Sequence, residues 1–142
     1  MIEEYYNNAN EQPEHIFNVA RLCKRFQVSQ LVVEANGPGH AMAQHLSREL
    51  LGMCEVTTQN MSESHKAAIT NTMRGYIGSG DVTFSLNSNF MDEIPYFIQT
   101  FNDKGKMKRG ARPHFHDDAI IAACHCLHLL ITGKSRVMMT SL

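Results

Sequence analysis

The sequence predicts an α/β fold with a largely parallel sheet. Segments with helical apolar spacing alternate with short strand-like segments, in the order helix–strand–helix–strand–helix–strand–helix–helix. This alternation is typical of α/β proteins. A hydrophobic fraction of 43% over 142 residues is enough for one modest core and excludes a largely disordered chain. Because no repeat, low-complexity segment or internal boundary interrupts the pattern, we expect one domain, with its core at about residues 14–132.

The first half of the chain supplies two helices and two strands. Residues 1–12 are polar, and we expect a strand end followed by a loop. Pro13 and Glu14 suit the first turn of an amphipathic helix over about residues 13–26. An apolar run at 30–35 predicts a strand buried on both faces, and it stops at the turn sequence Asn-Gly-Pro-Gly at 36–39. A second helix is expected at about 39–51, closed by Gly52, and a second strand at 53–58.

The second half continues the alternation. Ser62 and Glu63 predict the start of a helix that runs to about residue 77. The alternating segment 81–86 predicts a strand, and 90–101 predicts a helix kinked or delayed by Pro95. Residues 104–113 are basic and contain glycine, which indicates an exposed loop or a hairpin. The strongest helical pattern lies at 117–131, and residues 133–142 are expected to be a loose tail.

Composition excludes several classes of protein. No apolar run is long enough for a membrane span, and the first residues lack the basic and apolar regions of a secretory signal. Four scattered cysteines without a CxxC pair favour an intracellular chain with reduced thiols. The net charge of −1 excludes a globally basic nucleic-acid binder, but it permits a local basic patch.

Glu34 is the first candidate functional residue. It ends an apolar strand just before the Gly-Pro-Gly turn, where burial of a carboxylate is costly unless it is paired or bound to metal. In open α/β sheets, ligands collect outside the carboxyl ends of strands. A strand-end acid that simply points into water is an equally good interpretation of this position alone.

Asp117 and Asp118 are the second candidate. Adjacent acids at a helix start usually complement the helix dipole or cap the helix, and this structural explanation is favoured for the pair alone. However, Asp117 is in register with the apolar stripe of the helix, so it can point inward, with Asp118 beside it. Carboxylates on a strand end and on a facing helix start would suit Mg²⁺ or Mn²⁺, which prefer oxygen ligands.

A cluster of five cations directly precedes the acidic pair. A charge run of this kind is usually a solvated loop, but beside an acidic metal-binding cluster a contact with a phosphate backbone becomes about equally plausible. The predicted DNA-binding residues are Lys104, Lys106, Lys108, Arg109 and Arg112.

Other motifs are weaker. His114 and His116, and the segment Cys124-His125-Cys126-x-His128, suggest zinc, but consecutive helical residues point in different directions and we do not favour this site. One of the first two histidines would more plausibly assist a phosphate or a water. The Gly-Pro-Gly turn lacks the Gly-Lys-Ser/Thr of a Walker A loop, so no ATP site is expected.

Two motifs together resemble the nuclease domain of the large terminase subunit of tailed phages. Leu-Val-Val-Glu-Ala-Asn-Gly-Pro-Gly at 31–39 resembles the second acidic motif of that family, and His-Asp-Asp-Ala-x-x-Ala at 116–122 resembles the third. Between them, Lys66 and Arg74, then Gly80 to Phe84, then Phe90, Glu93 and Phe97 follow the same order of elements. The resemblance covers about residues 14–132.

This resemblance implies an RNase H-like fold of the RuvC and integrase type and metal-dependent cleavage of double-stranded DNA during genome packaging. Glu34 would be the second-strand ligand, and Asp117 or Asp118 would supply the third position; the apolar stripe favours Asp117. The implied mechanism is two-metal hydrolysis of a phosphodiester with Mg²⁺ or Mn²⁺. The implied partners are the rest of the large subunit, with the portal and the small terminase subunit as further ones, and the implied setting is the cytoplasm of the infected bacterium.

The sequence departs from the family pattern at its start. The first catalytic Asp of the family lies on a first, central strand, and no such strand is found here; Glu3 and Glu4 lie on the wrong element to replace it. We therefore expect a partial domain whose first strands, first Asp and ATPase domain come from another polypeptide. An inactive module that binds DNA or protein, or another RNase H-like endonuclease of the resolvase or transposase type, remains an alternative.

Overall fold

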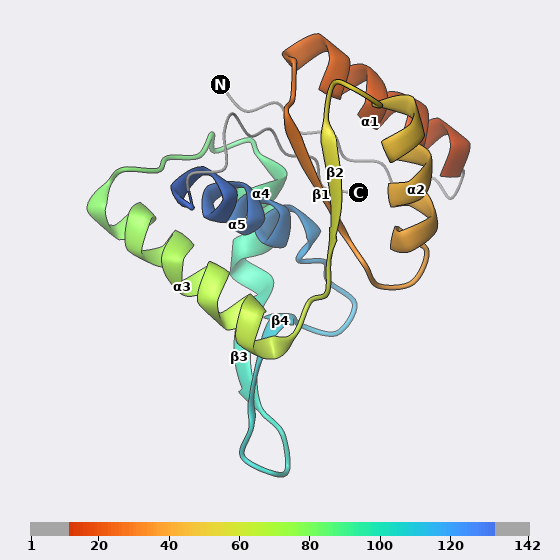
Figure 1. Cartoon of the computed structure of the whole chain (residues 1–142). Helices are drawn as coiled ribbons and strands as arrows, with labels where there is room; N and C mark the ends of the chain where they lie inside the picture. Colours follow the sequence, from red (N-terminus) through yellow and green to blue (C-terminus); the bar gives the residue numbers. More distant parts are fainter. Residues whose placement is uncertain (1–11, 133–142) are drawn as a thin grey trace. The chain divides into compact units, whose positions relative to one another are not determined.

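The structure is a computed structural model that describes residues 12–132, and these fall into two compact units. The first unit contains the residues up to Met61 and the end of the last helix from Leu129, and the second contains residues 62–128. Figure 1 draws both units. Their positions relative to one another are not determined, so each unit is described by itself.

The first unit consists of two helices and a two-stranded parallel sheet. Its elements are α1 (Gln12–Phe26), β1 (Gln30–Glu34), α2 (Gly39–Glu49) and β2 (Glu55–Gln59). The two strands pair in parallel from Gln30 opposite Glu55 to Glu34 opposite Gln59. The β1–α2–β2 segment is therefore a βαβ unit, as expected of consecutive parallel strands joined by a helix.

The core of this unit lies between α1, α2 and β1. Leu31 and Val33 are buried, whereas Val32 between them is half-buried, so the strand is less deeply buried on its second face than the apolar run suggested. The packed set is Val19, Ala20, Cys23, Val28, Leu31, Val33, Ala43, Leu46 and Leu50.

The Gly-Pro-Gly turn sets where α2 begins. Gly39 is buried, and a Cβ there would overlap the carbonyl oxygen of Glu34. Gly37 has a φ of +54°, in the left-handed region that favours glycine. Together they let the chain fold back directly from the end of β1 into α2.

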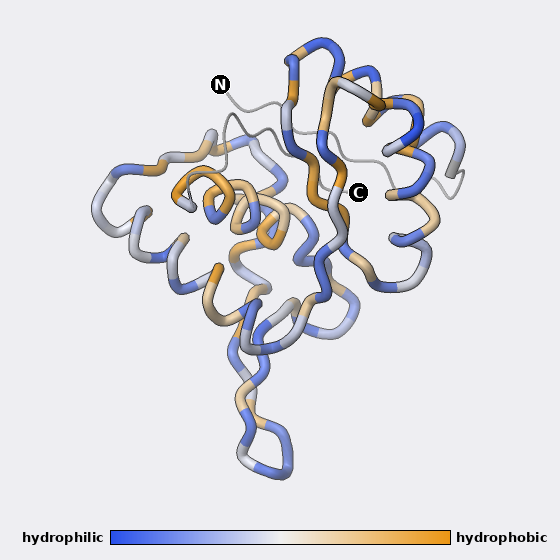
Figure 2. The backbone as a smooth tube through the Cα atoms, viewed as in Figure 1, coloured by the Kyte–Doolittle hydropathy of each residue, from blue (hydrophilic) through white to orange (hydrophobic). Residues whose placement is uncertain are grey.

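The second unit holds four helices or helical turns and an antiparallel hairpin. Its elements are α3 (Glu63–Ser79), α4 (Asn89–Glu93), the 3₁₀ turn η1 (Ile94–Tyr96), β3 (Phe97–Phe101), β4 (Met107–Ala111) and α5 (Asp118–Ile131), whose residues from Leu129 group with the first unit. Figure 2 shows α5 as the most hydrophobic helix, and seven of its residues are buried. A helix that is apolar on most sides is expected to be surrounded by other elements.

Local signals fix both ends of α3. The Ser62 hydroxyl accepts a hydrogen bond from the His65 backbone N–H at 3.2 Å, and Gly80 closes the helix with a φ of +81°. These are the preferred residue types for the two positions. The helix predicted at 62–77 is thus confirmed.

The strand predicted at 81–86 is wrong, because no strand is formed there. The backbone N–H groups of Asp81 and Val82 both bond to the carbonyl of Tyr76, which closes the end of α3. The Phe84 ring stacks on the Phe90 ring, with centroids 3.7 Å apart. The apolar alternation therefore reflects packing of this connection and not pairing in a sheet.

The helix predicted at 90–101 is wrong in its second half. Helix α4 ends at Glu93, Pro95 lies in the 3₁₀ turn, and the chain continues as β3. Proline disfavours a helical conformation of the residue before it and cannot donate a helical hydrogen bond. Strand β3 pairs antiparallel with β4, from Phe97 opposite Ala111 to Phe101 opposite Met107, so the hairpin alternative for the basic segment is confirmed.

The mixed α/β class is confirmed, but the described residues form two two-stranded sheets, one parallel and one antiparallel. The other predicted helices and strands are found close to their expected bounds. The expectations for residues 1–11 and for the tail from 133 lie outside the described residues. Within residues 12–132, no helix is both long and apolar enough to cross a membrane.

Candidate functional site

Asp117 and Asp118 lie at the start of α5. The backbone carbonyl of Asp117 accepts from the Ile121 N–H at 2.9 Å, which places Asp117 at the N-cap position. Its side chain is directed to Lys66 of α3: Lys66 Nζ lies 2.6 Å from Asp117 Oδ2, with the two side chains 14% and 22% exposed. The Asp118 side chain is 46% exposed. The pair thus combines one half-buried, paired carboxylate with one accessible carboxylate.

The first turn of α3 and strand β4 hold this ion pair between them. Glu63 Oε2 accepts from the Arg109 backbone N–H at 3.2 Å, which joins α3 to β4. The next residue of β4 is Gly110, where a Cβ would lie 3.2 Å from Asp117 Oδ2 and 3.3 Å from Lys66 Nζ. Glycine therefore allows the backbone of β4 to lie against the pair.

A buried carboxylate, Glu93 of α4, caps α5. It is 8% exposed, and its Oε2 accepts from the Ile120 N–H at 3.0 Å, with the Ala119 N–H as a second donor. The pKa of Glu93 is raised, mainly because burial disfavours the charged form, and further by the nearby charges of Asp118 and Asp117. Glu93 thus meets the capping need of α5, which is the ordinary structural explanation for acids at a helix start.

The electrostatics of the acidic pair favour a cation. The pKa of Asp118 is raised, first by burial and then by repulsion from Asp117, while His116 and Lys66 oppose the rise. His116 Nδ1 lies 3.6 Å from Asp118 Oδ2, which is longer than a hydrogen bond. Carboxylate oxygens are the ligands that Mg²⁺ and Mn²⁺ prefer. In this structure the positive charge beside Asp117 is the Lys66 ammonium. Within the described part of the chain, however, no group of three or more His, Cys, Asp and Glu is positioned to hold a metal ion.

Glu34 ends β1 in the first unit, and its side chain is exposed. The Asn36 amide donates to Glu34 Oε1, and the Ala35 N–H bonds to the Gln59 carbonyl at 2.9 Å, which extends the pairing of β1 with β2. The structure therefore gives Glu34 a fixed backbone position at a strand end and an accessible carboxylate.

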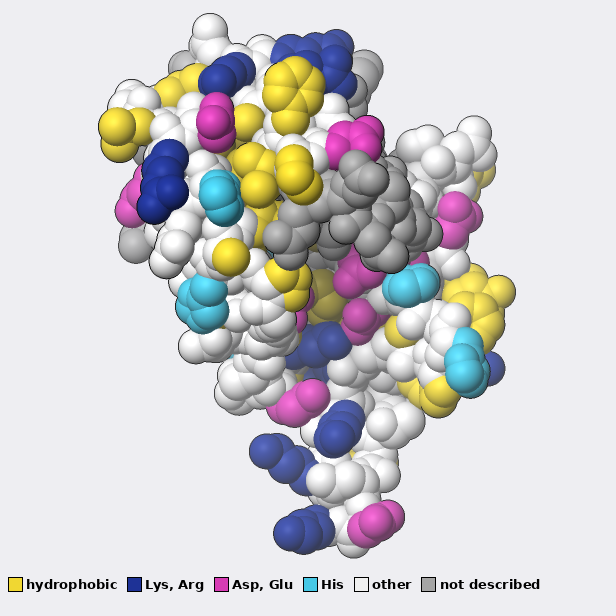
Figure 3. All heavy atoms as spheres, turned by 90° about the vertical axis from the view of Figure 1, so that its right-hand side faces the viewer, with side chains coloured by type: hydrophobic (Ala, Val, Ile, Leu, Met, Phe, Trp, Pro, Cys, Tyr) yellow, Lys and Arg dark blue, Asp and Glu magenta, His cyan; other side chains and the backbone are white. Residues whose placement is uncertain are grey.

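The five predicted DNA-binding cations lie on or beside the hairpin. Figure 3 shows Lys and Arg side chains along it. Lys104, Lys106, Lys108 and Arg112 are exposed. Arg109 is different: its guanidinium donates to Asn71 Oδ1 at 3.4 Å and, with the Gln99 amide turned so that its oxygen faces the arginine, to that oxygen at 2.9 and 3.1 Å. Arg109 therefore joins the hairpin to α3 more than it faces solvent.

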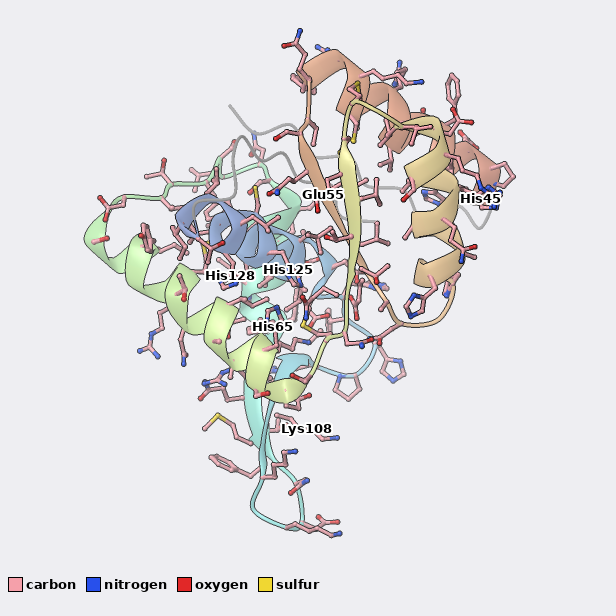
Figure 4. All side chains as sticks on the ribbon, in the orientation of Figure 1. His45, Glu55, His65, Lys108, His125 and His128 are labelled. Atoms are coloured by element: carbon pink, nitrogen blue, oxygen red, sulfur yellow. The ribbon has the colours of Figure 1, made fainter. Side chains whose placement is uncertain are left out.

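The histidines of the weaker zinc interpretation occur in a different arrangement. His125 and His128 of α5 lie beside His65 of α3, with ring centroids 5.2 and 5.8 Å from the His65 ring (Figure 4). Burial, followed by the neighbouring histidines, lowers the pKa of His125 to about 4, and burial also lowers the pKa of His65. His65 and His125 are therefore neutral at pH 7.

Of three comparisons with known proteins, the comparison with solved structures relates the fold to a known one. No family model matches the sequence, and no curated protein matches it. The crystal structure of the large terminase nuclease from the thermophilic phage G20c, with bound cobalt, matches with a TM-score of 0.69 and 20% identity. The chain has the fold of a phage terminase nuclease. The match covers 84% of this chain and 62% of that chain, so the chain spans less than two thirds of the length of its neighbour.

The structural match supports the sequence resemblance independently, because the match depends on backbone geometry and not on the two short motifs. Sequence reasoning named the acids but gave no role to Lys66, Glu93 or Gly110. Their partners in the site lie far along the chain: Lys66 and Asp117 are 51 residues apart, and Glu93 and Ile120 are 27 residues apart. The sequence signal for Lys66 and Glu93 was limited to their places in the order of elements, and Gly110 appeared only as a glycine of the basic segment.

Proposed function

We propose that this chain is the nuclease part of a phage large terminase subunit, a metal-dependent endonuclease that cleaves double-stranded DNA during genome packaging. The observation that carries the proposal is the Asp117–Asp118 pair at the start of α5, in a chain with the fold of a terminase nuclease. The cobalt in the neighbouring structure supports a role for divalent metal.

In this proposal Glu34, Asp117 and Asp118 are the metal ligands contributed by this chain, with Mg²⁺ or Mn²⁺ as the ions. Bound ions of this kind supply an activated water and stabilise the leaving 3′ oxygen. The chain's own residues prepare the ligands: Glu93 fixes the first turn of α5, and Gly110 lets β4 lie against the Asp117 side chain. The fold would be RNase H-like, and the rest of the large subunit would supply the remaining ligand.

Partners follow from the same proposal. The exposed hairpin lysines would contact the phosphate backbone of the duplex, since cations on an accessible element bind DNA largely without regard to sequence. The rest of the large subunit would be a permanent partner, and the portal and small terminase subunit would be transient ones, in the cytoplasm of the infected bacterium.

A nuclease assay tests the catalytic claim. The full chain, alone and co-expressed with the product of the reading frame directly upstream, is incubated with linear duplex DNA and Mg²⁺ or Mn²⁺. We expect cleavage by the complex, and we expect Glu34→Ala and Asp117→Ala to abolish it without loss of assembly, while the exposed control Asp92→Ala retains it. DNA binding without cleavage under every condition would contradict the proposal and favour an inactive module. A preference for branched DNA would favour a resolvase-type enzyme.

A salt titration tests the DNA-binding surface. We expect the triple change of Lys104, Lys106 and Lys108 to Gln to weaken duplex binding and to reduce the slope of log K against log salt by roughly 2–3, since each phosphate contact contributes about 0.9. A matched triple change of exposed α1 cations, Arg21, Lys24 and Arg25 to Gln, removes the same charge from another element. Equal losses in the two triple variants would show that only net charge matters.

A further inference from the structure

The ammonium of Lys66 lies on Oδ2 of Asp117, one of the two oxygens through which this carboxylate could bind a metal ion. The 2.6 Å distance from Nζ to Oδ2 is that of a direct, charge-assisted hydrogen bond, and both side chains are largely shielded from water. The backbone of Gly110 lies against both groups, and the Phe97 ring lies 5.9 Å from Nζ. The pair is therefore a built feature of α3, β4 and α5 and not a surface contact.

A second cation on the same carboxylate competes with the ammonium, because the two positive charges would lie close together. Two positive charges within about 4 Å of each other in a partly shielded site repel by several kcal/mol, at an effective dielectric constant of about 20. Lysine can leave because its ammonium is carried on a flexible four-carbon stem, whereas a fixed backbone donor could not. Asp118, which is more exposed, remains accessible to an incoming ion.

We propose that Lys66 is an exchangeable counter-ion of the acidic pair: its ammonium neutralises Asp117 while no metal is bound and is displaced when a divalent cation binds. The proposal rests on the proposed function, in which Asp117 is a metal ligand. Lys66 is a positioning residue that sets the affinity for metal, and it keeps the carboxylate in place between cycles of metal binding.

Binding of Mn²⁺ to the full chain tests the exchange, with free Mn²⁺ followed by electron paramagnetic resonance at pH 7.5. We expect Lys66→Met to bind Mn²⁺ more tightly than wild type by about tenfold to a hundredfold, the range that corresponds to one hydrogen bond between charged groups. Lys66→Arg keeps the charge and should leave the affinity close to that of wild type. Lys24→Met removes an exposed lysine of α1 and should likewise leave the affinity close to that of wild type. Asp117→Asn should abolish the binding.

The outcomes separate this inference from the proposed function. Equal affinity of wild type and Lys66→Met, with binding lost in Asp117→Asn, overturns the exchange and leaves the metal site intact. Absence of binding, or binding that Asp117→Asn does not change, overturns both. Should Lys66→Met fail to fold, a Mg²⁺ titration of wild type followed through the ¹⁵Nζ resonance of Lys66 decides: a shift to the position of a free lysine supports the exchange, and an unchanged resonance at saturation overturns it.

Discussion

Glu93 offers a direct test of how the start of α5 is held. Its carboxylate is 8% exposed and accepts from the N–H groups of Ile120 and Ala119. Glu93→Ala removes both acceptors and leaves these helix N–H groups without a partner. Loss of a helix cap costs about 1 kcal/mol, and a buried unsatisfied donor costs about 1–3 kcal/mol. Because these contributions overlap, we expect Glu93→Ala to lower the free energy of unfolding by about 2–3 kcal/mol.

Glu93→Gln separates the hydrogen bonds from the charge. The amide oxygen can still accept, and the neutral side chain no longer suffers burial of a charge or repulsion from Asp117 and Asp118. We expect Glu93→Gln to change the free energy of unfolding by no more than about 1 kcal/mol, because these gains offset the lost attraction between the charge and the helix dipole.

The effect of pH has a definite sign. Because the pKa of Glu93 is raised in the folded protein, folding takes up a proton between the ordinary glutamate pKa and the raised one. The associated stability is present below this window and is lost as the pH rises through it. Glutamine resembles the protonated form, so Glu93→Gln should compare more favourably with wild type at pH 7 than at pH 4.

Urea unfolding followed by circular dichroism measures these differences, with unchanged m-values as the check that the unfolding transition is the same. Asp92→Ala, an exposed acid one residue away on α4, is the control and should change stability by no more than about 0.5 kcal/mol. A loss below about 0.5 kcal/mol for Glu93→Ala, or equal losses for the Ala and Gln variants, would refute the capping role.

Three further expectations concern the same unit. His125→Leu should reduce the loss of stability on acidification. The pKa of His125 is about 4 in the folded protein, so folding opposes protonation of this side chain. Wild type therefore loses roughly 1–2 kcal/mol of stability, after allowance for solvent screening, as the pH falls from about 6.5 toward 4. Gly110→Ala should destabilise by about 1 kcal/mol in thermal unfolding, because its Cβ would crowd both partners of the ion pair. Lys66→Met and Asp117→Leu should each lower the free energy of unfolding by more than the double variant does, because each single change leaves one shielded charge without its partner. A double-mutant cycle in urea should give a coupling energy of about 1–3 kcal/mol.

Matched control variants test whether these effects are specific to the chosen residues. The control for His125→Leu is His40→Leu, which replaces an exposed histidine of α2. Gly78→Ala adds a methyl group in α3 where nothing lies within 4 Å, and it should stabilise by about 0.5–1 kcal/mol through helix propensity. Destabilisation by Gly78→Ala equal to that by Gly110→Ala, or coupling near zero in the cycle, would contradict the description of the site.

Sequence reasoning predicted best where the signal was local. Ser62 and Gly80 bound α3, and the Gly-Pro-Gly turn separates β1 from α2, because capping and backbone conformation depend on neighbouring residues. It failed where one pattern fits two structures. Phe90, Ile94 and Phe97 recur at helical spacing, yet Pro95 ends the helix and the chain becomes β3.

The acidic residues of the candidate site could be predicted from the sequence, but the residues that contact and position them could not. The acidic motifs can be read from consecutive residues, and the roles of Glu34, Asp117 and Asp118 as ligands stay predictions. Lys66 and Glu93 are ordinary helix residues in the sequence, and only the packing of α3 and α4 around the start of α5 gives them partners. Tertiary contacts between distant residues leave no local pattern to recognise.

The acidic pair is more than the fold requires. Helix starts attract acids because free N–H groups and the dipole need a negative partner. Here the buried Glu93 accepts from the Ala119 and Ile120 N–H groups. Asp117 is instead paired with an ammonium from another helix, and the pKa of Asp118 beside it is raised, first by burial and then by repulsion from Asp117. Stability alone therefore gives no reason for two acids at this position, which agrees with the proposal that the pair binds a divalent cation.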